Sequence, residues 1–372
     1  MPWILICEKS GKTEKTENRQ IWSLTVESIF VARMVREGTW RKEVVPAAIV
    51  GLNHDVTIYR ATRKGDLVVY KKHGDRNTFC PPLWWDLAIG SGSCGLGCRG
   101  CFLMLTHRSM RDPLRPLIYE NVEDFWDVVR GWLLALDRQR QHTLGLGIDR
   151  CDSLLYEGIT GHARHLIPMF ANPQQNPKAN LLVLLTKSTN VGYLEGLPTR
   201  NVAISFSLNP EPIADLWEGK WPNTLERISP PISDRLSACL QAQQWGFETR
   251  WRLDPILTPP GWQREYEVFL AEAAAMGLRP RRITFGTYRE KNPQLDIWRE
   301  KWGLPAMEWE PDHLTKDGTH NRSPETDRCA IYQAVAGLCR KYFPASTVGL
   351  CKETYAVRDQ VGLCNAHCNC LR

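Results

Sequence analysis

Several features that mark other classes of protein are missing from this sequence. No apolar run reaches the roughly 20 residues that cross a bilayer, so no membrane-spanning helix is expected. The opening residues, MPWILICEKSGK, hold a short apolar patch with no basic region before it and no small-residue cleavage site after it, which argues against a secretion signal. Internal repeats and low-complexity segments are also absent. The sequence is that of an ordinary globular protein.

The spacing of cysteines that is typical of a disulfide scaffold is missing too. The chain of 372 residues has 13 cysteines, and they are clustered rather than spread along it. Clusters of this kind fit metal–thiolate sites in a reducing compartment, so we expect a cytoplasmic, oxygen-sensitive protein. The net charge of +6 is small, and it permits a nucleic-acid partner without requiring one.

The most informative segment is Cys94-Gly-Leu-Gly-Cys98-Arg-Gly-Cys101. Three cysteines are too few to saturate a tetrahedral metal and too closely spaced to be ordinary core residues. Three thiolates on one short loop suit three corners of a [4Fe–4S] cube, with the fourth iron open to a small-molecule ligand. The glycines among them let the backbone curl around such a group, because glycine tolerates positive φ. A zinc knuckle and three buried thiols are the alternatives.

The pattern after this loop predicts an α/β fold. Short apolar strands alternate with amphipathic helices, which indicates a parallel sheet, here a partial (β/α)6 barrel. The loop then follows the first barrel strand, at the strand end where such barrels carry their chemistry. The expected strands are 83–89, 143–148, 181–185, 202–208, 249–255 and 282–285, and the expected helices are 121–138, 161–170, 233–245 and 262–276.

Three regions are expected along the chain: an α+β extension over residues 1–78, the barrel over 79–290, and a short cysteine-rich segment over 291–372. In the first region we expect a helix at Trp22–Val35 and strands at 47–52, 56–61 and 67–71, the last two joined as a hairpin. In the third we expect polar loops over 290–325, a helix over 325–343 and a strand over 346–351.

Six segments carry a family resemblance when they are taken together and in order. The C-x3-C-x2-C loop is the signature of radical S-adenosylmethionine (SAM) enzymes, and the ordered set resembles the spore photoproduct lyase family among them. The resemblance covers roughly residues 80–350; each segment is weak alone, but the ordered set is specific. The segments are Cys94–Leu103, Asp149–Leu154, Leu185–Ser188, Ile204–Pro210, Arg252–Ile256 and Lys341–Pro344.

This resemblance implies a chemistry and a set of residues. Members of the family use a [4Fe–4S] cluster to cleave SAM to a 5′-deoxyadenosyl radical, which reverses a UV-induced thymine dimer in DNA. By resemblance, Cys94, Cys98 and Cys101 bind the cluster, and Cys151 gives a hydrogen atom to the substrate radical. The implied SAM contacts are Asp149, Ser153, Lys187 and Ser207.

Each of these residues also has an ordinary interpretation. A lysine after a strand is more often a solvated loop residue, and Asp149 serves equally well as a helix or turn cap. Cysteine is among the most buried residue types, so Cys151 taken alone would be assigned to the core. The position of Cys151 just after a barrel strand and beside Ser153 favours the hydrogen donor.

Two positions depart from the family pattern. Family members usually carry an aromatic residue before the third cysteine and a tyrosine after it, where this chain has Gly100 and Phe102. Phe102 can pack on the adenine or the cluster, but it has no hydroxyl to relay a hydrogen atom. The relay is therefore missing or comes from elsewhere, for instance Tyr156 or Tyr288, and the substrate and the recycling of SAM stay open.

The tail holds a second group of cysteines with His367 among them. Their density suits an auxiliary iron–sulfur cluster or a structural zinc, and uncoordinated thiols are an equal alternative. These cysteines are Cys351, Cys364, Cys368 and Cys370.

Basic residues gather in two places that an anionic substrate could contact. One group lies on the expected hairpin, and the other lies near the expected strand ends; solvated faces and salt bridges are the ordinary interpretations of both. Trp84 and Trp85 are candidates to hold an opened duplex. The basic groups are Arg60, Arg63, Lys64, Lys71, Lys72 and Arg76, and Arg250, Arg252, Arg281, Arg282 and Arg289.

Three hypotheses follow. The first is a radical SAM enzyme that resembles spore photoproduct lyase, with DNA as substrate and an electron donor such as flavodoxin or ferredoxin. The second keeps the radical chemistry but acts on a different nucleic-acid or peptide substrate. The third is a non-catalytic DNA-binding protein that uses metal only structurally.

Overall fold

A parallel β-sheet forms the centre of the molecule. The computed structural model describes residues 40–63, 66–70, 84–91, 94–101, 116–134, 141–148, 151–219, 228–290, 294–301, 307–317, 320–363 and 368–371. The sheet has the strand order β15-β11-β10-β9-β8-β7-β4-β3, and neighbours are parallel except for the antiparallel edge strand β3. Its strands are β3 (Val68–Tyr70), β4 (Trp84–Leu87), β7 (Thr143–Leu146), β8 (Leu181–Thr186), β9 (Val202–Ser207), β10 (Glu248–Ile256), β11 (Arg282–Thr287) and β15 (Thr347–Leu350).

The central strands are apolar on both faces because both faces are covered. In β8, Leu182 and Leu184 belong to the main core, whereas Leu181 and Val183 pack in a separate cluster with Cys368 and Cys370 of the C-terminal tail. Near-continuous apolar strands such as LLVLLT are typical of parallel sheets that are buried on both sides. The tail therefore covers the face of the sheet that the helices leave open.

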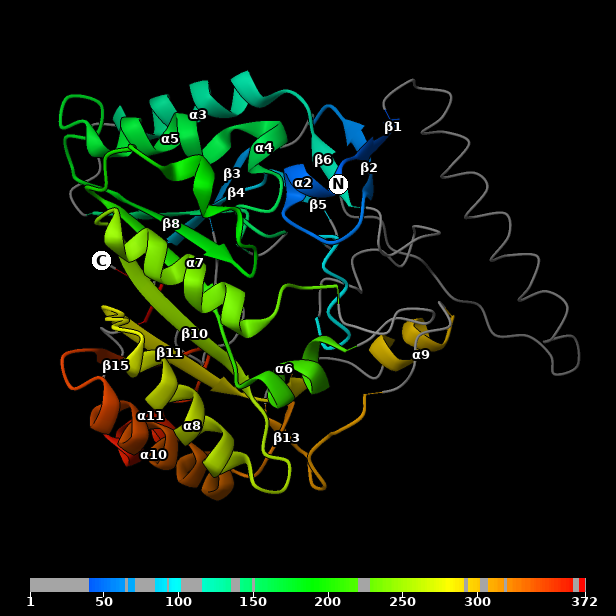
Figure 1. The fold of residues 1–372 in the computed structure, drawn as a ribbon, viewed down its shortest axis with the longest axis vertical. Coiled ribbons are helices and arrows are strands. Elements are labelled where there is room, and N and C mark those ends of the chain that lie inside the picture. Colours follow the sequence, from blue (N-terminus) through cyan, green and yellow to red (C-terminus); the bar gives the residue numbers. More distant parts are fainter. Residues whose placement is uncertain are drawn as a thin grey trace, which may run out of the picture.

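Helices between the strands pack on the other face. In Figure 1, α3 and α5 lie side by side, α7 crosses beside β10, and α8 packs against α10. Shorter helices occupy the loops that follow the strands. The helices are α3 (Val122–Leu134), α4 (Glu157–Thr160), α5 (His162–Ala171), η2 (Asn190–Leu194), α6 (Glu211–Glu218), α7 (Ile232–Gln244), α8 (Trp262–Ala275), α9 (Gln294–Lys301), α10 (Glu325–Tyr342) and α11 (Tyr355–Val361).

Two small sheets flank the large one. The first, in the order β1-β2-β6-β5, lies with helix α2 (Ala47–Val50) at one side of the molecule (blue and cyan in Figure 1). The second has the order β12-β14-β13. Their strands are β1 (Trp40–Val45), β2 (Val56–Ala61), β5 (Gly90–Ser91) and β6 (Leu117–Tyr119), and β12 (Arg289–Glu290), β13 (Thr315–Asp317) and β14 (His320–Arg322).

The α/β order expected from the sequence is confirmed, with each barrel strand within a few residues of its expected place. Closure into a partial barrel stays a prediction, as do the three expected regions. The helix expected at Trp22–Val35 lies outside the described residues. Among the described helices, none has the length and apolar character to span a bilayer.

Three local expectations are wrong. The strand expected at 47–52 is instead the short helix α2, which begins after Pro46 and ends at Gly51 in the left-handed conformation. Periodicity cannot separate a short buried helix from a strand, although the Pro and Gly at its ends are helix signals. The expected hairpin does not form, because β2 pairs with β1 and β6, whereas β3 pairs with β4. The region 290–325 contains β12, α9, β13 and β14 rather than loops alone.

Candidate active site

The expected site residues follow neighbouring strands of the large sheet. The cysteine loop comes after β4 and β5, Cys151 and Ser153 come after β7, Lys187 comes after β8, and Ser207 ends β9. The carboxyl ends of parallel strands meet at one edge of a sheet, which is where α/β proteins place their ligands. The fold therefore places the described members of the expected site at a single edge of the sheet.

The cysteine loop is compact and buried. Cys98 is buried, and Cys94 and Cys101 are half-buried; none of the three forms a disulfide with a described cysteine, and all three pack in one small cluster. Gly95 and Gly97 have φ of +87° and +60°, so the loop turns where only glycine is unstrained. Burial raises the pKa of Cys98 to about 12, although Lys187 opposes this. Burial, Asp152 and the other two cysteines raise the pKa of Cys94 as well.

The thiols of this loop match the ligand type of an iron–sulfur cluster. A four-iron cube uses a different iron for each thiolate and so keeps its ligands further apart than one ion does. Iron supplies the positive charge that favours the thiolate form, which burial alone opposes. The donor set of the loop therefore fits a [4Fe–4S] cluster with one open iron.

Residues distant in sequence hold this loop in place. The backbone N–H groups of Arg99 and Gly100 donate to the carbonyls of Glu218 and Trp217, each at 3.0 Å. The Arg99 guanidinium contacts Glu308 at 2.8 Å, and Arg299 donates twice to the Arg99 carbonyl, at 3.0 and 2.8 Å. The end of α6, Arg299 of α9 and Glu308 thus hold the loop in position.

The departure from the family pattern at Gly100 has a packing reason. A Cβ built on Gly100 would lie 2.3 Å from the Trp217 ring, so a side chain there would overlap the indole. The Trp217 ring in turn makes an edge contact with Tyr288 at 6.1 Å between ring centroids. An aromatic ring therefore lies beside the loop, but it comes from α6 instead of from the loop itself.

Cys151 lies in a space that two glycines leave open. Its Sγ is 2.8 Å and 3.6 Å from the positions that a Cβ would take on Gly147 and Gly90. Nearby, the buried Tyr156 hydroxyl donates to the Cys94 carbonyl at 2.7 Å. Burial, together with the Cys94 and Cys151 thiols, raises the pKa of Tyr156. Tyr156 therefore joins the surroundings of Cys151 to the cysteine loop.

Ser153 and Asp152 make internal hydrogen bonds at the ends of the strands. The Ser153 hydroxyl donates to the Leu146 carbonyl at 2.6 Å and accepts from the Leu185 N–H at 2.8 Å, so it joins β7 to β8. Asp152 accepts from the Lys187 N–H at 2.6 Å and from the Thr186 hydroxyl at 2.8 Å. The single hydroxyl proton of Ser153 is already used, which leaves it only as an acceptor for any ligand.

Lys187 belongs to a buried group of charges that the sequence did not predict. Its ammonium contacts the Glu218 carboxylate at 2.7 Å, and Arg235 and Ser229 bind the same carboxylate. The backbone carbonyl of Ser207 accepts from Arg235 at 3.2 Å. No sequence motif marks Glu218 or Arg235. Asp149 and Phe102 lie outside the described residues, so their expected SAM contacts stay predictions, as do those of Ser153, Lys187 and Ser207.

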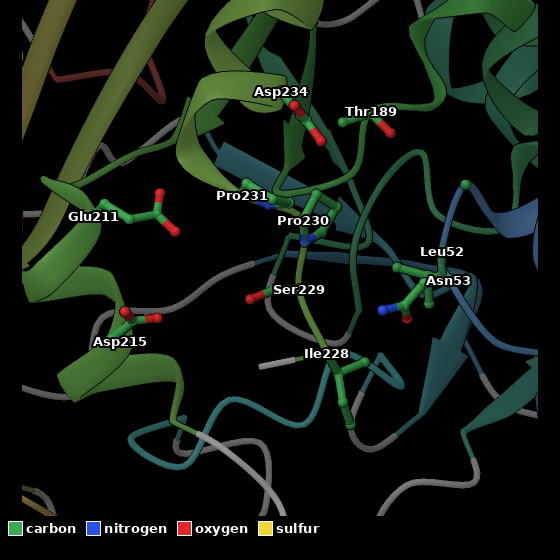
Figure 2. Close-up of a pocket in the computed structure, with 11 residues that line it drawn as sticks. Leu52, Asn53, Thr189, Glu211, Asp215, Ile228, Ser229, Pro230, Pro231 and Asp234 are labelled. Carbon is green, nitrogen blue, oxygen red and sulfur yellow. The ribbon is translucent and has the colours of Figure 1, made fainter. Parts of the chain in front are cut away.

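A cavity of about 600 Å³ opens beside this group of charges. Figure 2 shows that Ser229 faces the same space as the carboxylates of Glu211, Asp215 and Asp234. None of the described residues that line it is a lysine or arginine. Carboxylates repel a phosphate backbone, so this cavity is unsuited to hold DNA phosphates and better suited to a cationic group.

Three of the four tail cysteines come together, but around an arginine. Arg252 donates to the Cys370 sulfur at 3.3 Å, and it lies in the electrostatic range of Cys351 and Cys368. In the part of the chain that the structure describes, no metal-binding arrangement of these side chains is found. Cys364 lies outside the described residues. A second cluster or a zinc in the tail, expected from the sequence, is therefore not supported.

Most of the described residues expected to contact DNA have internal partners. Arg60 pairs with Glu43 at 2.6 Å, and Trp85 donates to His142 at 3.0 Å while packing near Trp132. Arg63 donates to the Asp66 carbonyl. Arg250 and Arg282 bind carbonyls of the tail, and Arg289 pairs with Asp254. Lys64, Lys71, Lys72 and Arg76 lie outside the described residues.

Comparisons with solved structures identify the fold. Spore photoproduct lyase complexed with dinucleoside spore photoproduct superposes with a TM-score of 0.61 and 16% identity, covering 78% of this chain and 82% of that one. A variant of that enzyme with bound AdoMet and dinucleoside spore photoproduct has a TM-score of 0.58 and 16% identity, with 71% and 75% coverage. A further variant has a TM-score of 0.60 and 15% identity, with 78% and 82% coverage.

No family model matches the chain, and no curated protein matches it significantly. At 16% identity, the structural likeness establishes the architecture and not the reaction. The resemblance suggested by the six sequence segments is thus confirmed at the level of the fold: the chain has the fold of spore photoproduct lyase.

Proposed function

We propose that this protein is a radical SAM enzyme that resembles spore photoproduct lyase. The observation that carries the proposal is the loop of three cysteines outside disulfides at the strand-end edge, between Lys187 and Tyr156, in a fold shared with a SAM-binding lyase. Cys94, Cys98 and Cys101 would hold a [4Fe–4S] cluster, and Lys187 would bind the SAM carboxylate by a charge-assisted hydrogen bond. Ser207, Ser153, Asp149 and Phe102 remain the proposed further SAM contacts.

When bound, the cluster and SAM supply a 5′-deoxyadenosyl radical, and the proposed substrate is a UV-induced thymine dimer in DNA. In this proposal Cys151 gives its hydrogen atom to the substrate radical. Its burial in the space left by Gly147 and Gly90 limits access of water to the thiol. Tyr156 is the proposed substitute for the missing tyrosine of the loop, because its hydroxyl is hydrogen-bonded to the Cys94 carbonyl.

The expected partners follow from this chemistry. A small electron donor such as flavodoxin or ferredoxin would reduce the cluster, and an oxygen-sensitive cluster is consistent with the cytoplasm. A partial (β/α)6 barrel remains the proposed description of the large sheet. It would place the cysteine loop and Cys151 at one opening of the barrel.

The test is anaerobic incubation of reconstituted protein with dithionite, SAM and DNA that contains the dimer. Mass spectrometry follows thymine products and 5′-deoxyadenosine. Restoration of the two thymine residues with sub-stoichiometric 5′-deoxyadenosine would establish the lyase and the recycling of SAM. The proposal is overturned in its general form if no 5′-deoxyadenosine forms at all.

The role of Cys151 gives a second test. We expect Cys151→Ala to keep SAM cleavage but to lose most restoration of thymine residues, because the substrate radical is no longer quenched by a thiol. Products of side reactions should appear in its place. Cys239→Ala is the matched control, since Cys239 is an equally buried thiol in α7, away from the strand-end edge.

One observation favours a second candidate. The cavity beside Lys187 and Glu218 is lined by three carboxylates, which suits a cationic group better than a phosphate. Of the two alternative substrates, a different nucleic acid or a peptide, the cavity favours the peptide, because a peptide can carry a cationic side chain and has no phosphates. Formation of 5′-deoxyadenosine from SAM without repair of the dimer would favour this candidate over the first.

A further inference from the structure

Glu218 is the centre of a buried group of charges at the end of α6. Its side chain is 3% exposed, yet it is bound by two cations and a hydroxyl. Lys187 contacts Oε1 at 2.7 Å, Arg235 contacts Oε1 at 2.9 Å and also Oε2, and Ser229 donates to Oε2. A buried carboxylate needs such partners, since an unpaired one would be strongly destabilising.

The same residue also holds the cysteine loop. The backbone carbonyl of Glu218 accepts from the Arg99 N–H at 3.0 Å, next to Cys98. Gly219 follows with a φ of +70°, a conformation that favours glycine, and a Cβ there would overlap the Arg99 guanidinium. Glu218 thus joins the cysteine loop, through its backbone, to Lys187, through its side chain.

Among the described residues, the contacts of Lys187 leave its ammonium fixed but not saturated. Its backbone N–H is held by Asp152 at 2.6 Å, and its side chain, 20% exposed, reaches Glu218. An ammonium has three N–H donors, and Glu218 accepts from one of them. The others can serve a ligand's carboxylate without breaking the pair.

Arg235 differs from Lys187 in this respect. Its side chain is 1% exposed, and it donates to Glu218, to the Pro230 carbonyl and to the Ser207 carbonyl. Because these hydrogen bonds already use most of its N–H donors, the Arg235 guanidinium has few left for a ligand. Arg235 therefore anchors Glu218, whereas Lys187 is the cation that faces outward.

From these contacts we propose that Glu218 is a positioning residue, which, anchored by Arg235, fixes the Lys187 ammonium beside the cysteine loop so that it binds the carboxylate of SAM. This inference rests on the proposed function. It concerns only the recognition of the SAM carboxylate, for which Glu218 and Arg235 hold Lys187 in position.

The test compares SAM with decarboxylated SAM, which lacks only the carboxylate. Dissociation constants of both are measured by equilibrium dialysis on anaerobically reconstituted wild type and Glu218→Asp. Aspartate keeps the negative charge but is one methylene shorter, so it cannot reach both Arg235 and Lys187. We expect the preference for SAM over its decarboxylated form to fall about tenfold, the loss typical of one charge-assisted hydrogen bond.

Glu267→Asp is the matched control. Glu267 pairs with Lys341 at the same 2.7 Å distance, but on the surface, and should leave the preference unchanged. If Glu218→Asp fails to fold, the double variant Glu218→Gln with Arg235→Gln replaces it, because it removes one charge of each sign. Melting temperature and iron content check that each variant is intact.

The outcomes separate this inference from the proposed function. Weaker binding of both ligands by the same factor, or an unchanged preference, would show a merely structural role for Glu218 and overturn the inference. Wild-type protein that binds SAM without preferring it to the decarboxylated form would overturn it as well, and leave the radical SAM proposal standing. Wild-type protein that binds neither ligand would overturn both.

Discussion

At the scale of single residues, the site depends on glycines, because their lack of a side chain leaves room for neighbouring groups. Gly100 leaves room for the Trp217 ring, and Gly147 leaves room for the Cys151 thiol. Where a sequence motif gives a glycine, only the structure identifies the neighbour that requires it. Two predictions belong to this scale, one for a glycine and one for a buried histidine.

We expect Gly100→Ala to lower the cluster content and the stability. Its Cβ would lie 2.3 Å from the Trp217 ring, and relieving that overlap costs about 1–3 kcal/mol. Iron analysis and urea unfolding measure both effects. Gly131→Ala is the control, since nothing lies within 4 Å of its Cβ position in α3, and it should raise stability slightly. Equal behaviour of the two variants would contradict this account.

His162 should make the protein sensitive to acid. Burial, followed by the neighbouring His165, lowers its pKa from 6.5 to about 3, and within the described structure neither ring nitrogen has a hydrogen-bond partner. Below pH 6.5 the His162 imidazole binds a proton in the unfolded chain but stays neutral in the folded chain. The free energy of unfolding therefore falls as the pH drops from 6.5 towards 3.

The measurement is urea unfolding at pH 7 and pH 5. Between these pH values the wild type should lose about 2 kcal/mol more than His162→Leu does. His165→Leu is the control, because that ring is half-buried and stacks on Trp126. A wild type and a His162→Leu variant with the same pH dependence would show that His162 takes up its proton in the folded state.

At the scale of elements, the tail over residues 368–371 acts as part of the sheet. Asn369 is fully buried and binds three strands: its amide donates to Ser205 on β9 and to the Trp251 carbonyl on β10, and it accepts from Thr284 on β11. Four residues could not fold alone, but here they complete the packing of the sheet.

Asn369→Ala should therefore destabilise the whole protein. Three buried partners lose their hydrogen bonds, and each unsatisfied group costs about 1–3 kcal/mol, partly offset by relaxation. Urea unfolding should show a loss of several kcal/mol, whereas the exposed Asn53→Ala should change little. A small loss for Asn369→Ala would indicate that the tail is not docked in solution.

At the scale of the whole molecule, the two groups of cysteines have different surroundings. The loop of Cys94, Cys98 and Cys101 lies at the strand-end edge, where a cation would relieve burial of its thiolates. Cys368 and Cys370 lie against the sheet with Arg252 already beside them. In our proposal, the same residue type binds a cofactor in one place and packs against the sheet in the other.

Iron content tests the proposal that the loop cysteines bind a cofactor and the tail cysteines do not. We expect about four irons per chain to remain in the double variant Cys368→Ser with Cys370→Ser, and very little to remain in Cys98→Ser. Absorbance near 400 nm after anaerobic reconstitution gives the same comparison. Loss of iron from the tail variant alone would contradict the assignment of these cysteines to packing.

The sequence by itself determined the α/β order, the edge at which the site lies and the cysteine loop, because apolar periodicity and cysteine spacing are local patterns. It could not determine α2, where four residues are too few for a period to be recognised. It also missed β13 and β14, whose polar residues carry no apolar alternation.

Only the tertiary structure decided which side chains from distant parts of the chain contact one another. Glu218 and Arg235 lie 31 and 48 positions after Lys187 in the chain (218 − 187 and 235 − 187), and no local pattern links a carboxylate at the end of α6 to a lysine after β8. The same holds for Arg252 among the tail thiols and for Trp217 beside Gly100. Such contacts arise when separate elements pack together, so they depend on the folded geometry of the whole chain and not on the spacing of its residues.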